Sequence, residues 1–537
     1  MKKLLFLSFS IILPIALLSQ TLTDKHIVAS KPFKSHTDVV FNTSKSAPFW
    51  SEDFANGIPA TWVNSTAPWV YRGPGTIPGT NVGSQGAYMA NQTPIASATQ
   101  QNGFILFDSD YYDNNGTQGN FGGGMYPAPH NGELMTDMID LTGYNDVTLM
   151  AHSYFRTFQG QAFVAFYLNG LFVSQIEVHS DLSVNDATPT DAIALVRFPQ
   201  AVCNQPNVQM KFLFDGTTQS NVNGAAYYFW MLDDLALMET PAYLMDIIDQ
   251  NHGGWDIGYA STGGFFGMDF TFKPQIQSDA NPYMFEMTIA NVGANPLHGI
   301  QMNVEVLDYF GSVVFNSSSD TTTLMPLDTA NYLATGTYSP ANTGVYNMKF
   351  WANADSLPSS AQSDTSYMWG IITDSVYARD YDSPGGAWRV GRQCGGLQLG
   401  NMFDIYAPDE ITSVSAYVAD YSVVGAEMYG ALYEYDTTSG SFLLLAQTDD
   451  YVIQAQDRDN WVTISFPQAF NAIPGHYMLT IGGYPHPTDT FGINVSGPAE
   501  QTMSRIVDDG SGCNLGSATT FPAWYWITDC PMIRMNF

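Results

Sequence analysis

The sequence predicts an all-β protein built from several sandwich domains. Charged residues make up only 13% of the 537 residues and aromatic residues 14%, a composition typical of β-sandwiches with polar loops. Short segments of alternating apolar and polar residues are separated by Asn, Gly and Asp turns. No amphipathic helical pattern interrupts them, which argues against parallel βαβ units. A chain of this length exceeds one core and favours three or four domains.

The N-terminal segment has the pattern of an export signal. Lys2 and Lys3 precede an apolar run over residues 4–18, so we interpret residues 1–20 as a signal peptide that is removed on export. Residues 21–46 are rich in Ser, Thr and Lys without periodicity, which predicts a flexible leader. No later apolar run is long enough to span a bilayer, so we expect a mature chain without a transmembrane segment, located outside the cell or on its outer surface.

Alternating strands divide the rest of the chain into three predicted domains, at residues 47–240, 241–365 and 366–537. In the first domain, strands are predicted at 134–143, 147–156, 163–170, 208–215 and 227–234. In the second domain they are predicted at 283–293, 302–308 and 343–352. In the third domain they are predicted at 430–435, 461–466, 475–481 and 523–537. Short strands with turn residues between them indicate antiparallel sandwiches.

Two segments bracket the first domain, EDFANGIPATW at 52–62 and WMLDDLAL at 230–237. They resemble the opening and closing strands of cleaved-adhesin modules, also called choice-of-anchor J modules, of secreted Bacteroidetes proteins. The resemblance implies a jelly roll related to MAM domains. It also implies a module that binds or displays rather than catalyses.

The other two domains also resemble secreted modules. TIANVG at 288–293, with GVY at 344–346, resembles immunoglobulin-like spacers of the CARDB type. The segment 523–537 resembles the last strand of jelly rolls that precede the sorting domain of proteins exported by type IX secretion. Together these resemblances imply two jelly-roll-type β-sandwiches flanking an Ig-like β-sandwich. A sorting domain usually follows in such proteins and none follows Phe537 in this sequence, so sorting and cell-surface attachment are left open.

An acidic loop is the first candidate site, and calcium is the one cofactor expected. Asp108, Asp110 and Asp113 lie close together in a Gly- and Asn-rich stretch, and Ca²⁺ prefers carboxylate and carbonyl oxygens. The alternative is an ordinary polar turn held by Asx hydrogen bonds.

Asp233 and Asp234 form a second acidic candidate for calcium. The first and last strands of a jelly roll lie side by side, so we expect Glu52 or Asp53 to approach this pair. Alternation along the strand implies that only one of the two aspartates faces inward.

Aromatic residues suggest a binding site for sugars. Tyr111 and Tyr112 lie beside the acidic loop, and flat aromatic rings stack on the apolar C–H faces of sugar rings. Trp524 and Trp526 alternate onto one side of the last predicted strand. In a closing strand we expect that side to face the core.

Four cysteines remain in the exported chain, and none forms a CxxC pair that would indicate zinc. Cys513 and Cys530 flank one short segment, and export permits a disulfide between them. Closing that loop would stabilise the native state by about 3 kcal/mol. Cys203 and Cys394 fall in different predicted domains, so we expect buried free thiols there.

Charge and motifs limit the function. The net charge is −32, from 50 acidic and 18 basic residues, and such a surface repels nucleic acid. No HExxH, GxSxG, P-loop, dinucleotide-binding or EF-hand pattern occurs, so we do not expect an enzyme. The sequence predicts a secreted or cell-surface, non-catalytic, adhesin-like protein that binds an extracellular glycan or protein. The alternative is a carbohydrate-binding accessory protein of polysaccharide degradation.

Overall fold

The computed structural model describes residues 48–537 apart from 89–91, 159, 181, 183–185, 218–226, 254–269, 358–364, 393–394, 500–502, 511–519 and 528. The predicted signal peptide and leader lie outside this part. Nearly all regular structure is strand, which confirms the all-β prediction. The α-helices in the described residues are α2 (Ser109–Asn114) and α4 (Gln275–Ala280). No helix there is long and apolar enough to cross a membrane.

The first sandwich consists of two antiparallel sheets. One contains, in spatial order, β3 (Val70–Arg72), β4 (Phe104–Asp108), β11 (Tyr227–Glu239), β6 (Val147–Phe158) and β9 (Ile193–Arg197), with β1 (Trp50–Glu52) beside β11. The other contains β2 (Val63–Asn64), β5 (Asn131–Met135), β10 (Val208–Asp215), β7 (Gln161–Leu168) and β8 (Leu171–Val178). Trp69, Phe107 and Trp230 are buried between the two sheets. Large aromatic side chains therefore supply much of the apolar area that holds this sandwich together.

The second sandwich packs a small sheet against a larger one. The small sheet contains β12 (Met245–Gly253), β14 (Met284–Asn291) and β18 (Thr329–Leu333). The large sheet contains β13 (Phe272–Pro274), β20 (Ser366–Thr373), β19 (Gly344–Asn353), β15 (Leu297–Leu307) and β16 (Val313–Ser318), with β17 (Thr322–Leu324) beside β15. Because β20 pairs with β19, this sandwich extends to Thr373, beyond the boundary predicted near residue 365.

The third sandwich contains the remaining strands. One sheet contains β21 (Val376–Tyr377), β34 (Ile533–Asn536), β24 (Asp409–Val418), β30 (Phe491–Pro498) and β22 (Gly386–Gly391), with β28 (Asn460–Ala472) beside β24 and β33 (Asp529–Pro531) beside β30. The other contains β26 (Ser441–Gln447), β25 (Glu427–Asp436), β29 (Gly475–Gly483), β23 (Leu397–Ile405), β31 (Ser504–Asp508) and β32 (Ala523–Ile527), with β27 (Tyr451–Val452) beside β25. Trp388 is buried in this core, and its Nε1 donates to Asp529 Oδ2 at 3.3 Å.

Two local predictions need correction. The strand predicted at 134–143 ends at Met135, and beyond it the chain keeps a single bridge from Ile139 to Val208. The loop predicted around the acidic residues begins with helix α2, because Asp108 caps that helix by accepting from the Tyr111 amide. Both differences arise at strand ends, where side-chain hydrogen bonds compete with the ladder.

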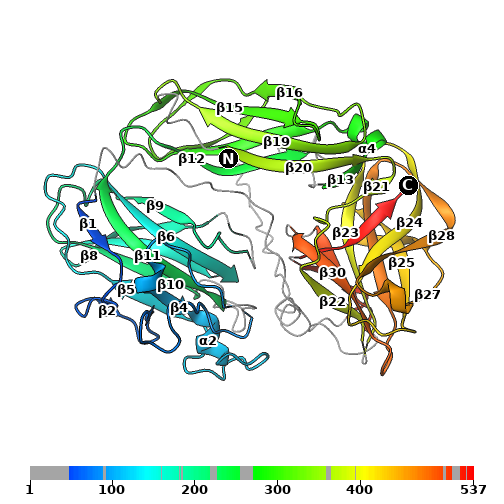
Figure 1. Cartoon of the computed structure of the whole chain (residues 1–537), viewed down its shortest axis with the longest axis horizontal. Helices are drawn as coiled ribbons and strands as arrows, with labels where there is room; N and C mark the ends of the chain where they lie inside the picture. Colours follow the sequence, from blue (N-terminus) through cyan, green and yellow to red (C-terminus); the bar gives the residue numbers. More distant parts are fainter. Residues whose placement is uncertain are drawn as a thin grey trace, which may run out of the picture.

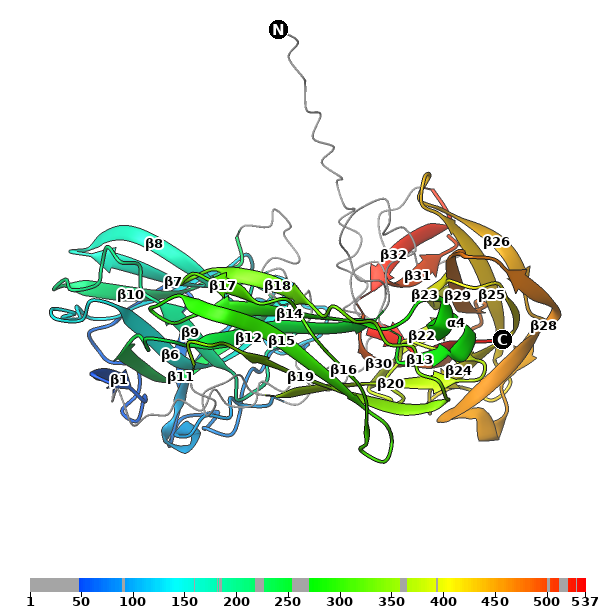
Figure 2. The ribbon, with the colours of Figure 1, turned by 90° about the horizontal axis from the view of Figure 1, so that it is seen from above.

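The three sandwiches form an arch, with the second lying across the top between the first and the third (Figure 1). The view from above shows the same order along the long axis (Figure 2). At the first junction, Arg197 Nη1 donates to the Gly293 carbonyl at 3.0 Å. At the second junction, Gln277 of α4 bonds the chain between β23 and β24.

Gln277 connects the second sandwich to the third. Its side chain is fully buried, and its Oε1 accepts from the amides of Tyr406 at 2.8 Å and Ala407 at 3.0 Å. Its Nε2 donates to the Ala407 carbonyl at 2.9 Å. One amide group thus satisfies three backbone groups of the neighbouring domain.

Replacing Gln277 with Ala should lower the stability of this junction by about 3 kcal/mol, because three buried backbone groups would lose their partner. Urea unfolding of the whole protein would measure the loss as a lower transition midpoint. The matched control is Ile276→Ala on the same helix, where the side chain is 45% exposed and a change within about 0.5 kcal/mol is expected. Equal effects of the two substitutions would contradict the role assigned to Gln277.

Candidate functional site

The acidic segment of the first sandwich is built around the N-cap of α2. Asp108 Oδ1 accepts from Ser84 Oγ at 2.6 Å, and its Oδ2 accepts from the Gln85 amide at 2.8 Å. Arg72 lies 3.9 Å from the same carboxylate. Burial raises the pKa of Asp108, and these hydrogen bonds act against the increase. This carboxylate therefore fixes a neighbouring loop to the start of the helix.

The other two carboxylates of this segment also bind backbone amides. Asp110 Oδ2 accepts from the Tyr88 amide at 2.9 Å, and burial raises the pKa of Asp110 to about 7. Asp113 Oδ1 accepts from the amides of Gly122 at 3.1 Å and Ala128 at 2.7 Å. Each of the two side chains organises a different stretch of loop.

These contacts bear on the predicted calcium site. The three carboxylates serve separate sets of amides, so the hydrogen bonds agree with the alternative of a polar turn. Among the residues that the structure describes, no group of three or more His, Cys, Asp or Glu side chains could hold a metal ion. Calcium at this loop stays a prediction.

The second acidic pair lies where the first and last strands of the first sandwich meet. β1 pairs with β11 so that Glu52 is opposite Leu235, which confirms the predicted proximity of the two strands. A register shift follows Asp233, which is fully buried, whereas Asp234 is half-buried. One of the two aspartates is buried, as predicted, but Asp233 shares a face of β11 with Met231 and lies beneath the loop before β4, outside the core between the sheets.

Hydrogen bonds tie this pair to the loop before β4. Ser97 Oγ donates to Asp233, and the Asp234 amide donates to Asp233 Oδ1 at 2.9 Å. Thr99 Oγ1 donates to Asp234 Oδ1 at 2.7 Å. Burial, together with the nearby charges of Asp234 and Asp53, raises the pKa of Asp233 to about 7.

The two tyrosines predicted to stack on sugars lie mainly against the core. Tyr112 is 6% exposed, its hydroxyl donates to the Pro68 carbonyl, and its ring meets Phe107 edge-on at 5.6 Å. Tyr111 is half-buried and packs against the same core. Tyr112 therefore has no free ring face for a sugar, because its place on α2 turns it inward.

A different set of aromatic residues gathers in the third sandwich. In the sheet from β26 to β32, Leu432, Leu479 and Ile506 face the core. Alternation places the intervening side chains on the opposite face. We call the following group the aromatic face: Gln398, Tyr433, Tyr435, Phe442, Arg505, Trp524 and Trp526. All seven are half-buried.

The two edges of this sheet approach each other across the aromatic face. Trp524 on β32 stacks on Phe442 of β26 with ring centroids 3.9 Å apart, and it meets Tyr433 edge-on at 5.1 Å. These strands are the two ends of the six-strand order, so the sheet must curl. The curl brings Trp524 and Phe442 into contact across this face. Trp524 and Trp526 share one side of β32 as predicted, but it is the side opposite the buried Tyr525 and Ile527, and Trp524 packs against the margin of the core.

Polar groups lie among these rings. Arg505 on β31 is the cross-strand neighbour of Trp526, and its guanidinium carbon lies 5.2 Å from the centre of the Phe442 ring. Gln398 Oε1 accepts from the hydroxyls of Tyr433 at 2.9 Å and Thr480 at 2.8 Å. Sequence reasoning missed Arg505 and Gln398, although the alternating segment SRIVD at 504–508 predicts that Arg505 and Ile506 point to opposite faces.

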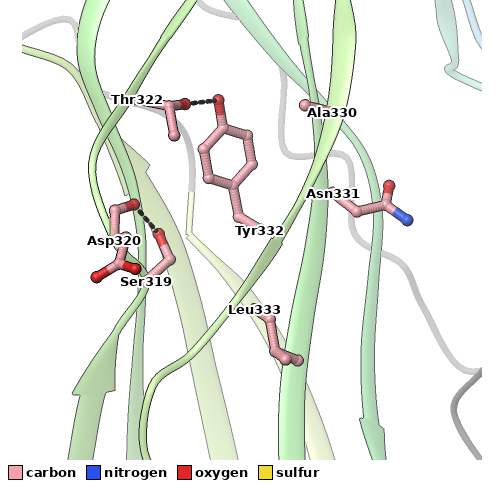
Figure 3. Close-up of a pocket in the computed structure, with 7 residues that line it drawn as sticks. All are labelled: Ser319, Asp320, Thr322, Ala330, Asn331, Tyr332 and Leu333. Atoms are coloured by element: carbon pink, nitrogen blue, oxygen red, sulfur yellow. Dashed lines mark hydrogen bonds between the residues drawn. The ribbon is translucent and has the colours of Figure 1, made fainter. Parts of the chain in front are cut away.

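The second sandwich carries an open pocket of about 270 Å³ between β17 and β18 (Figure 3). Its lining residues are Ser319, Asp320, Thr322, Ala330, Asn331, Tyr332 and Leu333. Thr322 Oγ1 and the Tyr332 hydroxyl lie 2.8 Å apart, so the tyrosine is already hydrogen-bonded within the protein. The lining contains one carboxylate, Asp320, and one aromatic residue, Tyr332, whose hydroxyl is already bonded. This pocket therefore presents fewer groups that could contact a ligand than the aromatic face does.

The structure describes two of the four cysteines, Cys203 and Cys530. Cys203 is a buried free thiol, as predicted. Cys530 is also buried, and burial raises the pKa of its thiol to about 12. Cys394 and Cys513 lie outside the described residues, so the Cys513–Cys530 disulfide stays a prediction.

No protein-family model matches the chain, and neither does any curated protein. Solved structures with partial similarity include a β-glucuronidase from Bacteroides uniformis, 10% identical over 48% of this chain and 28% of that chain, with a TM-score of 0.26. A β-galacturonidase of family GH2 from Eisenbergiella tayi is 10% identical over 49% of this chain and 40% of that chain, with a TM-score of 0.25. The matched parts span less than half of these enzymes, and similarity of this size does not define a function.

Replacing Asp233 with Asn should stabilise the first sandwich at alkaline pH. The folded-state pKa is about 7 against an ordinary value of 3.8, so between these values the native carboxyl keeps a proton that the unfolded chain loses. The stability it contributes is full below about pH 4 and is lost as the pH rises through about 7. The loss by about pH 8 is on the order of 4 kcal/mol.

Calorimetric melting at about pH 4 and about pH 8 checks this prediction. Asp233→Asn should melt higher than the unmodified protein at the upper pH and close to it at the lower pH, because the amide can still bond Ser97 and the Asp234 amide. Asp191→Asn is the control, since Asp191 is exposed in the same sandwich. If the melting temperatures of the variant and the unmodified protein differ by the same amount at both pH values, the raised pKa assigned to Asp233 is wrong.

Proposed function

We propose that this chain is an exported, non-catalytic, adhesin-like protein that binds extracellular glycans through the aromatic face of its third sandwich. The observation that carries the proposal is the sheet face that combines aromatic rings with polar groups. Trp526 and Arg505 are cross-strand neighbours there, and Tyr433 and Gln398 are hydrogen-bonded to each other. Rings that stack on C–H faces, together with polar groups for hydroxyls, are the chemistry that sugars require.

The absence of catalysis is part of the same proposal. The carboxylates of Asp110 and Asp233 have pKa values raised to about 7, the range that suits a general acid or base. Both side chains are fully buried and hydrogen-bonded to neighbouring loops. Such contacts support a structural role for these two acids rather than contact with a substrate.

Replacing Trp526 with Ala should weaken glycan binding by roughly threefold to tenfold, because aromatic contacts contribute about 0.5–1.5 kcal/mol each. A glycan array probed with the mature protein would identify a ligand, and titration calorimetry would then compare affinities. Tyr309→Ala is a matched control, since Tyr309 is 75% exposed in the second sandwich, away from the aromatic face. Binding that survives Trp526→Ala unchanged, or an array without any bound glycan, would overturn the proposal.

Calcium at the acidic segment belongs to this proposal. A bound ion would stabilise the native state by about 2.7 kcal/mol at 100 times its dissociation constant, and extracellular sites bind at roughly 10⁻⁴ to 10⁻³ M. The melting temperature in millimolar calcium should be higher than the melting temperature in chelator, and Asp110→Asn should remove this difference. Equal melting temperatures in the two solutions would rule out calcium binding. A difference that persists in the variant would place the ion elsewhere, with Asp233 and Asp234 the next candidates.

A further inference from the structure

Arg505 lies among the rings of the aromatic face without a carboxylate partner in the described residues. Arg197 and Arg534 each pair with aspartates, at Asp146 and at Asp380 and Asp382. The contacts of Arg505 are the rings of Phe442, at 5.2 Å, and Tyr435, at 5.9 Å. Its Nε is buried and has no hydrogen-bond acceptor in the described part of the chain. On a chain with 50 acidic residues, Arg505 thus has no ion pair within the part of the chain that the structure describes.

The neighbours of Arg505 also present donors rather than acceptors. Trp526, its cross-strand neighbour, has a buried Nε1 without an acceptor among the described residues. Gln398 lies diagonally across β23 and β31, since Gly400 is opposite Arg505 and Val507 is opposite Gln398. Because its Oε1 already accepts from Tyr433 and Thr480, the amide group of Gln398 is oriented with its NH₂ available to donate.

Unpaired donors of this kind favour an anionic ligand. A partly buried guanidinium without an acceptor is costly, and burial lowers the pKa of Arg505. A carboxylate matches the guanidinium fork with two parallel hydrogen bonds. The guanidinium carbon lies 5.2 Å from the centre of the Phe442 ring, within the range of a cation–π contact that supports the arginine in this position.

We propose that the aromatic face selects glycans that contain uronic acid residues, with Arg505 binding the sugar carboxylate and Trp526 contacting the sugar ring. This inference rests on the proposed glycan-binding function and adds the class of sugar. The net charge of the chain repels long polyanions. At about 0.15 M salt the screening length is about 8 Å, so the local contacts of a short acidic oligosaccharide decide its binding.

Titration calorimetry of the mature protein with trigalacturonic acid and with its methyl ester tests the inference at about 0.15 M salt. The two probes differ in the charge of the carboxyl group. We expect the acid to bind at least tenfold more tightly than the ester. Arg505→Gln should remove that difference by weakening binding of the acid far more than binding of the ester, and Arg505→Lys, which keeps the charge without the fork, should retain part of it. Arg458→Gln is the control, since Arg458 is exposed in the same sandwich.

Three outcomes would overturn the inference. Equal affinity for acid and ester, or equal weakening of both by Arg505→Gln, would show that Arg505 does not recognise the carboxylate of the sugar. Binding of a sulfated trisaccharide through Arg505, without binding of the uronic acid, would assign the face to sulfated sugars. Binding of only neutral glycans, weakened by Trp526→Ala, would leave the proposed function intact and remove the acidic sugar. Unchanged far-ultraviolet circular dichroism and melting of both Arg505 variants would exclude unfolding as the cause.

Discussion

The alternation of side chains along each strand is the constraint on which the rest of the structure depends. In β25, Leu432 faces the core while Tyr433 faces the opposite side. A shift of the register by one residue would exchange the two and lose both the core and the aromatic face. The sheet can keep aromatic rings on its second face because it curls, so that Trp524 and Phe442 cover each other.

Buried acids stabilise the loops that this sandwich architecture leaves between strands. Asp108, Asp113 and Asp233 accept hydrogen bonds from loop amides or hydroxyls, so the long connections of the first sandwich are tied to strand ends. Gln277 does the same between domains. In a chain with few charged residues, these polar side chains form hydrogen bonds mostly within the protein. Arg505 differs, because its Nε has no acceptor among the described residues.

Part of the candidate site could be predicted from single strands. Alternation put Trp524 and Trp526 on one side, and the adjacency of the opening and closing strands brought Asp53 near Asp233. The face itself could not be predicted, because Phe442 and Trp524 are far apart in sequence and meet only when a six-strand sheet curls. Tyr112 was assigned to a loop, and helix α2 turned it into the core.

The sequence by itself determined the all-β class, the three sandwiches and the absence of long helices from the described residues, because period-two patterns and turn residues are local properties of the chain. The tertiary structure decided which strands pair across long sequence separations. That pairing placed β20 in the second sandwich rather than the third. It also decided which polar groups find partners: Asp110 accepts from the Tyr88 amide and the Asn114 side chain, while Arg505 lies among rings and donors. Hydrogen bonding and burial depend on neighbours in space, so no local pattern specifies them.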